Sequence, residues 1–316
     1  MPISIGAGVA FGIGSAGSVS MGVGVSAPFA FTTPALMNGS SASAVMNLVT
    51  VNSSGLFVAV GRDSNYYPVY ATSSNGSSWT TPALMNGSSV YALMSAGTVN
   101  SSGLFVAVGY DANTYPVYAT SSNGSTWTTP ALMNGSSVYA NMSAVTVNSS
   151  GLFVAVGRNI NGYPIYATSA NGSTWTTPAL MNGSSVYANM SDVTVNSSGL
   201  FVAVGRDSNY YPLYATSSNG SSWTTPALMN GSSVYAQISA VAVNSSGLFV
   251  AVGSNNNGYP VYATSANGST WTTPAQMNGS TTPAFMQSVT VNSSGLFVAV
   301  GTNDTHAGYP LYATGS

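Results

Sequence analysis

The chain has 316 residues, only 3% of which are charged, and its formal net charge is −2. Ordinary soluble proteins contain roughly 25% charged residues, so solubility here must come from Ser, Thr, Asn and the backbone. A chain without a positive patch attracts neither nucleic acid nor an anionic membrane surface, and the absence of cysteine excludes disulfides, zinc–thiolate sites and cysteine nucleophiles.

Residues 1–28 alternate strictly between apolar residues at odd positions and Gly, Ser or Ala at most even positions. This is the period of a β-strand, and a turn is expected at Ser15–Ser18. Two strands have no core of their own, so the apolar face needs a partner. We expect an assembly arm that pairs with other copies or another protein; a strap along the rest of its own chain and a disordered tail are the alternatives. The face consists of Ile3, Ile5, Val9, Phe11 and Ile13.

The remainder of the chain repeats with a fixed period. The unit Gly-Leu-Phe-Val-Ala-Val-Gly begins at Gly55 and recurs five times at intervals of 48 residues, which is typical of an array of one supersecondary unit. Turn-forming Asn, Gly and Ser separate four runs of strand character in each unit, and no helical period is present. In the third unit these runs are Ala144–Asn148, Leu152–Val156, Tyr163–Thr168 and Trp175–Pro178.

Four antiparallel strands in a unit of this length describe a β-propeller blade. A Trp begins the fourth strand of five units, from Trp79 to Trp271, and should pack under the Asn-Gly turn before it. The position 48 residues before Trp79 is Phe31, in Phe-Thr-Thr-Pro-Ala-Leu. We therefore predict an all-β, six-bladed β-propeller of 48-residue four-stranded repeats at 29–316, preceded by the arm at 1–28. The strand at 29–35 would complete the last blade in a one-plus-three closure that leaves no open sheet edge.

The segment Ala-Thr-Ser-Ser-Asn-Gly-Ser-Ser-Trp-Thr at 71–80, with its copies, resembles the Asp-box turn of sialidase-like β-propellers. The resemblance covers residues 29–316 and implies architecture, because in that family the box is a folding device away from the ligand face. Asn stands where the family usually has Asp, at Asn75, Asn123, Asn171, Asn219 and Asn267. The arm also resembles the Gly-rich N-termini of some tailed-phage virion proteins.

Enzymatic activity is not expected. The resemblance to sialidase-like propellers suggests sialidase chemistry as one candidate activity. In that family the chemistry needs a Tyr activated by Glu, and this chain has no Glu. A glycosidase needs two carboxylates within about 10 Å, whereas Asp63 and Asp207 belong to blades half a ring apart.

His306, beside Asp304, is the only histidine and is interpreted as a solvated loop residue. Sites for nitrogen or sulfur metal ligands are excluded, and Asx-turns explain the Asp- and Asn-rich loops better than calcium does. No cofactor or metal is expected.

The units differ mainly between their second and third strands, where seven of the eight charged residues lie. Strand alternation places these loops on the same face as the connections that follow the fourth strands. We call this face the variable face; exposed loops can also drift freely, which is the alternative explanation. Its Tyr, Asn and Ser would form an adaptable recognition surface. The candidate ligand-binding residues are Arg62, Asp63, Tyr66, Tyr91, Tyr110, Asp111, Tyr139, Arg158, Asn159, Tyr187, Arg206, Asp207, Tyr210, Tyr235, Asn255, Asp304 and His306.

These features predict a non-enzymatic virion or cell-surface protein. Its variable face would bind a neutral polar ligand such as a cell-surface glycan, and residues 1–28 would anchor it to other copies or to a virion or fibre protein. The alternative is a purely structural subunit that polymerises through the arm into a fibre or coat. The first residues lack the basic region and apolar run of a signal peptide. The sequence also lacks an unbroken run of about 20 apolar residues, which a membrane-spanning helix would need.

Overall fold

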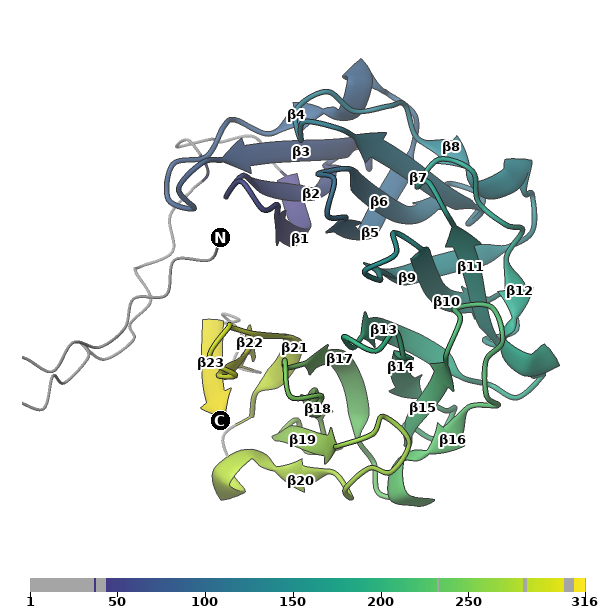
Figure 1. Cartoon of the computed structure of the whole chain (residues 1–316), viewed down its shortest axis with the longest axis vertical. Coiled ribbons are helices and arrows are strands. Elements are labelled where there is room, and N and C mark those ends of the chain that lie inside the picture. The colour runs from purple at the N-terminus through teal and green to yellow at the C-terminus, as the bar shows by residue number, and fades with distance from the viewer. Residues whose placement is uncertain (1–36, 38–43, 232, 281–282, 304–309, 316) are drawn as a thin grey trace, which may run out of the picture. The chain divides into compact units, whose positions relative to one another are not determined.

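The computed structural model describes residues 37, 44–231, 233–280, 283–303 and 310–315. These residues belong to one compact unit that is all-β. Six antiparallel sheets follow one another as blades around a ring, so the predicted six-bladed β-propeller is confirmed (Figure 1). Among the described residues, no helix is long and apolar enough to cross a membrane.

Strand order within each blade follows chain order, from the first strand near the ring centre to the fourth at the rim (Figure 1). Five blades have four strands, and the sixth has three among its described residues. The first three blades are β1 (Ala44–Val51), β2 (Phe57–Asp63), β3 (Pro68–Ser73) and β4 (Ala83–Leu84); β5 (Ala92–Val99), β6 (Phe105–Asp111), β7 (Pro116–Ser121) and β8 (Ala131–Leu132); and β9 (Ala140–Val147), β10 (Phe153–Asn159), β11 (Pro164–Ser169) and β12 (Ala179–Leu180).

The other three blades repeat this pattern, and a three-residue 3₁₀ turn of sequence Met-Asn-Gly follows each fourth strand. These blades are β13 (Asn189–Val195), β14 (Phe201–Arg206), β15 (Pro212–Ser217) and β16 (Ala227–Leu228); β17 (Gln237–Val243), β18 (Phe249–Ser254), β19 (Pro260–Ser265) and β20 (Ala275–Gln276); and β21 (Phe285–Val291), β22 (Phe297–Thr302) and β23 (Pro310–Gly315).

The fourth strand lies further along the chain than its sequence suggests. The expected strand at Trp175–Pro178 is replaced by β12, which pairs with β11 only through Ile165↔Leu180 and Tyr166↔Ala179. Before it, the Thr176 backbone and hydroxyl exchange two 2.9 Å hydrogen bonds with the Thr168 backbone. Since Pro178 has no N–H to give to a ladder, regular pairing can begin only after it.

A β-bulge in the first strand explains the second glycine of each repeated unit. The register between β9 and β10 shifts between Val156 and Gly157. At the shift the bulged strand brings the Asn141 carbonyl against Gly157, where any Cβ would overlap it. The position therefore requires glycine. The neighbouring Phe-Val-Ala-Val positions of β10 are buried on both faces, as expected for a strand between two blades.

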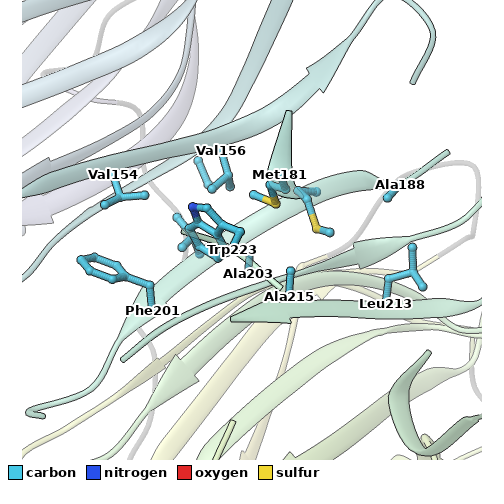
Figure 2. Packing of buried hydrophobic residues seen from close by; sticks show 12 residues of the cluster. Val154, Val156, Met181, Ala188, Phe201, Ala203, Leu213, Ala215 and Trp223 are labelled. Carbon is cyan, nitrogen blue, oxygen red and sulfur yellow. The ribbon is translucent and has the colours of Figure 1, made fainter. Parts of the chain in front are cut away.

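The hydrophobic cores lie between consecutive blades. Figure 2 shows Trp223 of the fourth blade beside Phe201 of its own blade and Val154 and Val156 of the third. The indole N–H also donates to the Gly220 carbonyl at 2.9 Å in the Asn-Gly turn, which confirms the predicted site under that turn. Trp127, Trp175 and Trp271 are buried in the same way, and Trp79 is half-buried.

Hydrogen bonds across the rim join the same blades. Asn182 of one Met-Asn-Gly turn has a positive φ of 47°, and its amide donates to the Thr225 hydroxyl of the next blade at 2.7 Å. Equivalent bonds join Asn86 to Thr129, Asn134 to Thr177 and Asn230 to Thr273. The predicted closing strand at 29–35, Phe31 within it, and the arm with its boundary at residue 28 lie outside the described residues.

Candidate functional site

The two variable connections lie side by side at the blade junctions. The loop between β10 and β11 gives its Gly162 carbonyl to the N–H of Ala188, where the next blade begins, at 2.9 Å. Ala92, Ala140, Ala236 and Ala284 donate in the same way to the loop of the preceding blade. The variable face is thus a set of backbone-linked junctions, each combining a loop from one blade with the entry into the next.

The loops of the first five blades are Asx-turns, each held by the side chain of one Asp or Asn. Asp63 accepts 2.8 Å hydrogen bonds from the N–H groups of Asn65 and Tyr67 through one carboxylate oxygen. Asn159 holds its loop with its amide oxygen in the same way, at 3.0 and 2.9 Å. Asp111, Asp207 and Asn255 repeat the arrangement. The Asx-turn interpretation is confirmed, and it gives five predicted site residues a structural role.

One position in these loops always has a positive φ but varies in residue type. It is Tyr66, Thr114, Gly162, Tyr210 and Gly258 in the first five blades, with φ between 59° and 74°. A non-glycine residue pays a cost of about 1–3 kcal/mol in sparsely populated backbone regions. The two tyrosines are therefore held in place by their contacts.

Tyr66 and Tyr210 each form a ladder of three side chains. The Tyr66 ring stacks on Tyr91 at 5.1 Å with 16° between planes, and the Arg62 guanidinium lies 4.2 Å from its centroid. Tyr210 stacks on Tyr235 at 5.0 Å, with Arg206 at 3.9 Å. The structure therefore brings six individually predicted residues together in two groups of three, and in each group the Tyr at positive φ contacts the other two.

The third blade has a pocket at the corresponding place. Because Gly162 has no Cβ, the ring of Tyr187 can lie against the loop where a Cβ would overlap it. The Tyr187 hydroxyl accepts a 3.4 Å hydrogen bond from Arg158. The result is a cavity of about 190 Å³ lined by Tyr139, Asn141, Arg158, Asn159, Ile160, Asn161, Gly162 and Tyr187.

Tyr110 of the second blade interacts electrostatically with residues of the first ladder and of this pocket. Burial, reinforced by Tyr91 and Tyr139, raises the pKa of the Tyr110 phenol, while Arg62 and Arg158 act in the opposite direction. The hydroxyl thus feels a guanidinium from each neighbouring blade and stays protonated at neutral pH. Tyr110 thus lies within electrostatic range of four other predicted residues from the first three blades: Arg62, Tyr91, Tyr139 and Arg158.

Asp192 is the charged residue that the sequence interpretation left without a role. Its carboxylate accepts 2.8 Å hydrogen bonds from Val193 in its own blade and from Val241 in the next. Burial raises its pKa to about 6, against the lowering effect of these two bonds. Ala144 and Ala240 occupy the equivalent positions of the two adjacent blades. The replacement of Ala by a charged residue in an inner strand is therefore the sequence signal that marks Asp192.

Other parts of the predicted set lie apart or cannot be placed. Asn255 serves its own Asx-turn in the fifth blade, and Asp304 and His306 lie outside the described residues. Sequence reasoning missed four pocket residues, of which Gly162 had a usable signal because it replaces Tyr66 and Tyr210 of the sister loops. The other three are Asn141, Ile160 and Asn161.

No protein-family model and no curated protein matches the sequence. The structure is similar to a lectin, BP39L from Burkholderia pseudomallei, with a TM-score of 0.68 and 12% identity over 89% of this chain and 82% of that one. The fold is that of the lectin and sialidase propellers.

Two further solved structures share this fold. A Dyadobacter fermentans protein of unknown function has a TM-score of 0.62 and 13% identity, covering 88% of this chain and 95% of that one. The Trypanosoma rangeli sialidase bound to the inhibitor DANA has a TM-score of 0.57 and 14% identity, over 86% of this chain and 55% of that one. At these identities the likeness shows the propeller fold alone.

Proposed function

We propose that the protein is a non-enzymatic binding protein whose variable face recognises a neutral polar ligand such as a glycan. The observation that carries this proposal is the pocket of the third blade, where two tyrosines, an arginine and several amides meet around about 190 Å³. Pockets for drug-sized ligands span roughly 300–1,000 Å³, so this one suits a single small ring.

The chemistry of the pocket fits a sugar ring. Tyr139 and Tyr187 offer aromatic surface to its C–H groups, and the Asn141 amide and Arg158 guanidinium can bond to its hydroxyls. The Asn159 oxygen is already used by the loop, which leaves its amide group as a donor. Backbone-fixed loops add preorganisation, which lowers the entropy cost of binding.

The state of the carboxylates supports a binding role over catalysis. The chain has no Glu, and Asp63, Asp111, Asp192 and Asp207 each accept backbone hydrogen bonds. Among the described residues, no three of His, Cys, Asp and Glu gather in a way that could hold a metal ion. General acid–base chemistry needs a carboxyl or imidazole free to exchange protons with a substrate. The backbone holds one carboxylate oxygen of Asp63, Asp111 and Asp207 and both oxygens of Asp192.

The test is a glycan array followed by titration calorimetry of any hit with the variant Gly162→Tyr. Sister loops carry Tyr at this position with φ of 62° and 64°, so the loop can hold it, and the new ring would fill the pocket. We expect affinity to fall at least about tenfold, or 1.4 kcal/mol. Gly258→Tyr is the matched control, because it makes the same change in the fifth blade, away from the pocket.

If Gly162→Tyr binds as tightly as the wild type, the pocket is not the site. If no glycan binds and the protein forms ordered polymers, the structural-subunit alternative is supported instead.

We also propose that residues 1–28 anchor the protein in an assembly on a virion or cell surface. The support is the alternating apolar pattern of the sequence, because full burial of four such side chains contributes roughly 6–12 kcal/mol before ordering costs. Light scattering should show self-association of the full chain and a monomer for residues 27–316. A monomeric full chain would contradict the anchoring role.

A further inference from the structure

The pocket of the third blade lies at a place where two other blades hold a ring of their own chain. Each ladder consists of an Arg, a middle Tyr at positive φ and a Tyr from the entry into the next blade. The third blade has the two outer members at the equivalent positions, Arg158 and Tyr187, but its middle member is Gly162. Its ladder therefore lacks one ring.

The two complete ladders show how a ring is held by such outer members. The guanidinium carbon of Arg206 lies 3.9 Å from the centroid of the Tyr210 ring, and Tyr235 stacks on the same ring at 5.0 Å with 14° between planes. The ladder of the first blade has nearly the same geometry, with 4.2 Å, 5.1 Å and 16°. A guanidinium is attracted to the electron-rich face of an aromatic ring, and stacked aromatic rings attract each other. The middle place thus suits a flat aromatic ring.

In the third blade, Tyr187 takes part of the space of the missing ring. A Cβ at Gly162 would overlap the Tyr187 ring. The loops with a middle Tyr have a Cβ at this position, so their outer Tyr rings lie further from the loop. The hydrogen bond that Arg158 donates to the Tyr187 hydroxyl is 3.4 Å long, beyond the usual range of about 2.7–3.2 Å. Tyr187 is therefore held only weakly in its inward position.

The space that remains has the size of one ring. The pocket has a volume of about 190 Å³, and an apolar cavity of about 150 Å³ is enough to bind benzene. An outward shift of Tyr187 to the position of the outer Tyr in a complete ladder would enlarge this space next to Arg158. The pocket can therefore take a six-membered aromatic ring without any change of the loop backbone.

The pocket also has an apolar residue that the ladder loops lack. Ile160 lines the pocket and is 67% exposed, whereas the equivalent residues of the first and fourth blades are Ser64 and Ser208. A ring bound in the pocket would remove part of this apolar side chain from water, which favours binding. The side-chain amides of Asn141 and Asn161 line the same pocket and offer donors and acceptors to a hydroxyl group.

We propose that this pocket binds the ring of a neutral phenol, which takes the place of the missing middle Tyr. The ring contacts the Arg158 guanidinium with its face and stacks on Tyr187, as Tyr210 does with its partners in the next blade. The phenol is carried either by a small molecule or by a tyrosyl residue of a peptide. The proposal rests on the pocket of the proposed function but not on its binding a glycan.

The first probe is para-cresol, which is the Tyr side chain without its backbone. The control compound is para-methylcyclohexanol, whose ring is puckered and has no aromatic face. Ligand-observed NMR titration of the full-length protein measures both affinities, and we expect the wild type to bind the cresol at least about tenfold more tightly.

The variant Gly162→Tyr should lose this preference, because the chain then supplies its own ring. Gly258→Tyr, which makes the same change in the fifth blade, should keep it. Equal affinities of the wild type for the two compounds would overturn the proposal. A preference for the cresol that persists in Gly162→Tyr would overturn it as well, because the ring would then bind elsewhere.

Three larger probes separate this proposal from glycan binding. The compound para-hydroxyphenyl glucoside carries the phenol on a sugar, N-acetyltyrosinamide carries it on a peptide unit, and methyl glucoside is the sugar without the ring. We expect at least one phenol-bearing probe to bind more tightly than methyl glucoside and to lose this advantage in Gly162→Tyr; the tighter of the two identifies the source of the ring. Methyl glucoside that binds as tightly as both would overturn the phenol proposal and support the glycan. Cresol binding without any glycan hit would support the phenol and contradict the glycan.

Discussion

The two faces of the propeller differ in how closely the units agree. On the face opposite the variable face, each turn between the first and second strands reads Asn-Ser-Ser-Gly. Its Asn accepts hydrogen bonds from two backbone N–H groups, as Asn148 does from Ser150 and Leu152 at 3.1 and 2.9 Å. On the variable face, the first five blades have the same kind of Asx-turn, and only the first and fourth of these carry the same side chains.

This comparison shows that variation in the loops does not mean variation in backbone. Asp111 and Asn159 hold their loops with the same pair of bonds. The residue at positive φ does change: it is Tyr where the two ladders form, Gly at the pocket and in the fifth blade, and Thr in the second blade. The loops of the variable face thus share one backbone and differ in their side chains. We call the blades and this shared loop backbone the frame. Substitutions in the frame and in the variable side chains should have different effects.

The frame should be the most sensitive part. Trp175 is 2% exposed and packs between two blades, so Trp175→Ala should lower the free energy of unfolding by about 3–5 kcal/mol. Denaturant titration measures the change. Val186→Ala, at a residue 64% exposed on the variable face, should change it by less than about 0.5 kcal/mol. Similar losses for the two variants would remove the distinction between frame and face.

Asp192 should make the frame sensitive to pH. Its pKa is about 6 in the folded protein and about 4 in an unfolded chain, so the folded state holds the proton more tightly. The free energy of unfolding should therefore be highest below pH 4 and fall as the pH rises to about 6, by about 1–3 kcal/mol.

The reference for this measurement is Asp192→Ala, which places the residue of the two adjacent blades, Ala144 and Ala240, at this position. The wild-type minus variant difference, measured by denaturant titration at several pH values, isolates the contribution of Asp192. A difference that does not change between pH 4 and pH 6 would contradict the raised pKa.

A small effect on stability is expected for Tyr210→Gly. It removes the contacts with Arg206 and Tyr235, which contribute about 1–2 kcal/mol together, but relieves a non-glycine positive φ of about 1–3 kcal/mol. The two effects oppose each other, so the net change should lie between a loss of about 1 kcal/mol and a gain of about 2 kcal/mol. The variant would give the fourth blade the glycine that opens the pocket of the third, and its neighbours Tyr187 and Asn189 already correspond to Tyr139 and Asn141.

For a ligand that binds the third blade, calorimetry should then show the number of sites rising from one toward two. Tyr66→Gly is the control, because the first blade has Ser43 and Val45 at the positions of Tyr139 and Asn141. A rise in both variants would mean that the glycine alone creates the site, and a rise in neither would separate the pocket from ligand binding.

Sequence reasoning predicted the blades well because the repeat period, the turn residues and the strand alternation are local signals. It misplaced the fourth strand, since an apolar Trp suggested a strand while Pro178 and the Thr168–Thr176 exchange delay regular pairing. The face on which the variable loops lie could be predicted from topology. The pocket could not, because it depends on how the Tyr187 ring lies against Gly162.

The position of the cores has a consequence for how the molecule melts. Each Trp cluster takes residues from two consecutive blades, so no 48-residue unit contains a complete core. A blade that opened alone would expose half of the core on each side of it, and its neighbours would lose the same apolar cover. Local opening of a single repeat is therefore nearly as costly as opening several. Despite its modular sequence, the ring should unfold as one cooperative unit.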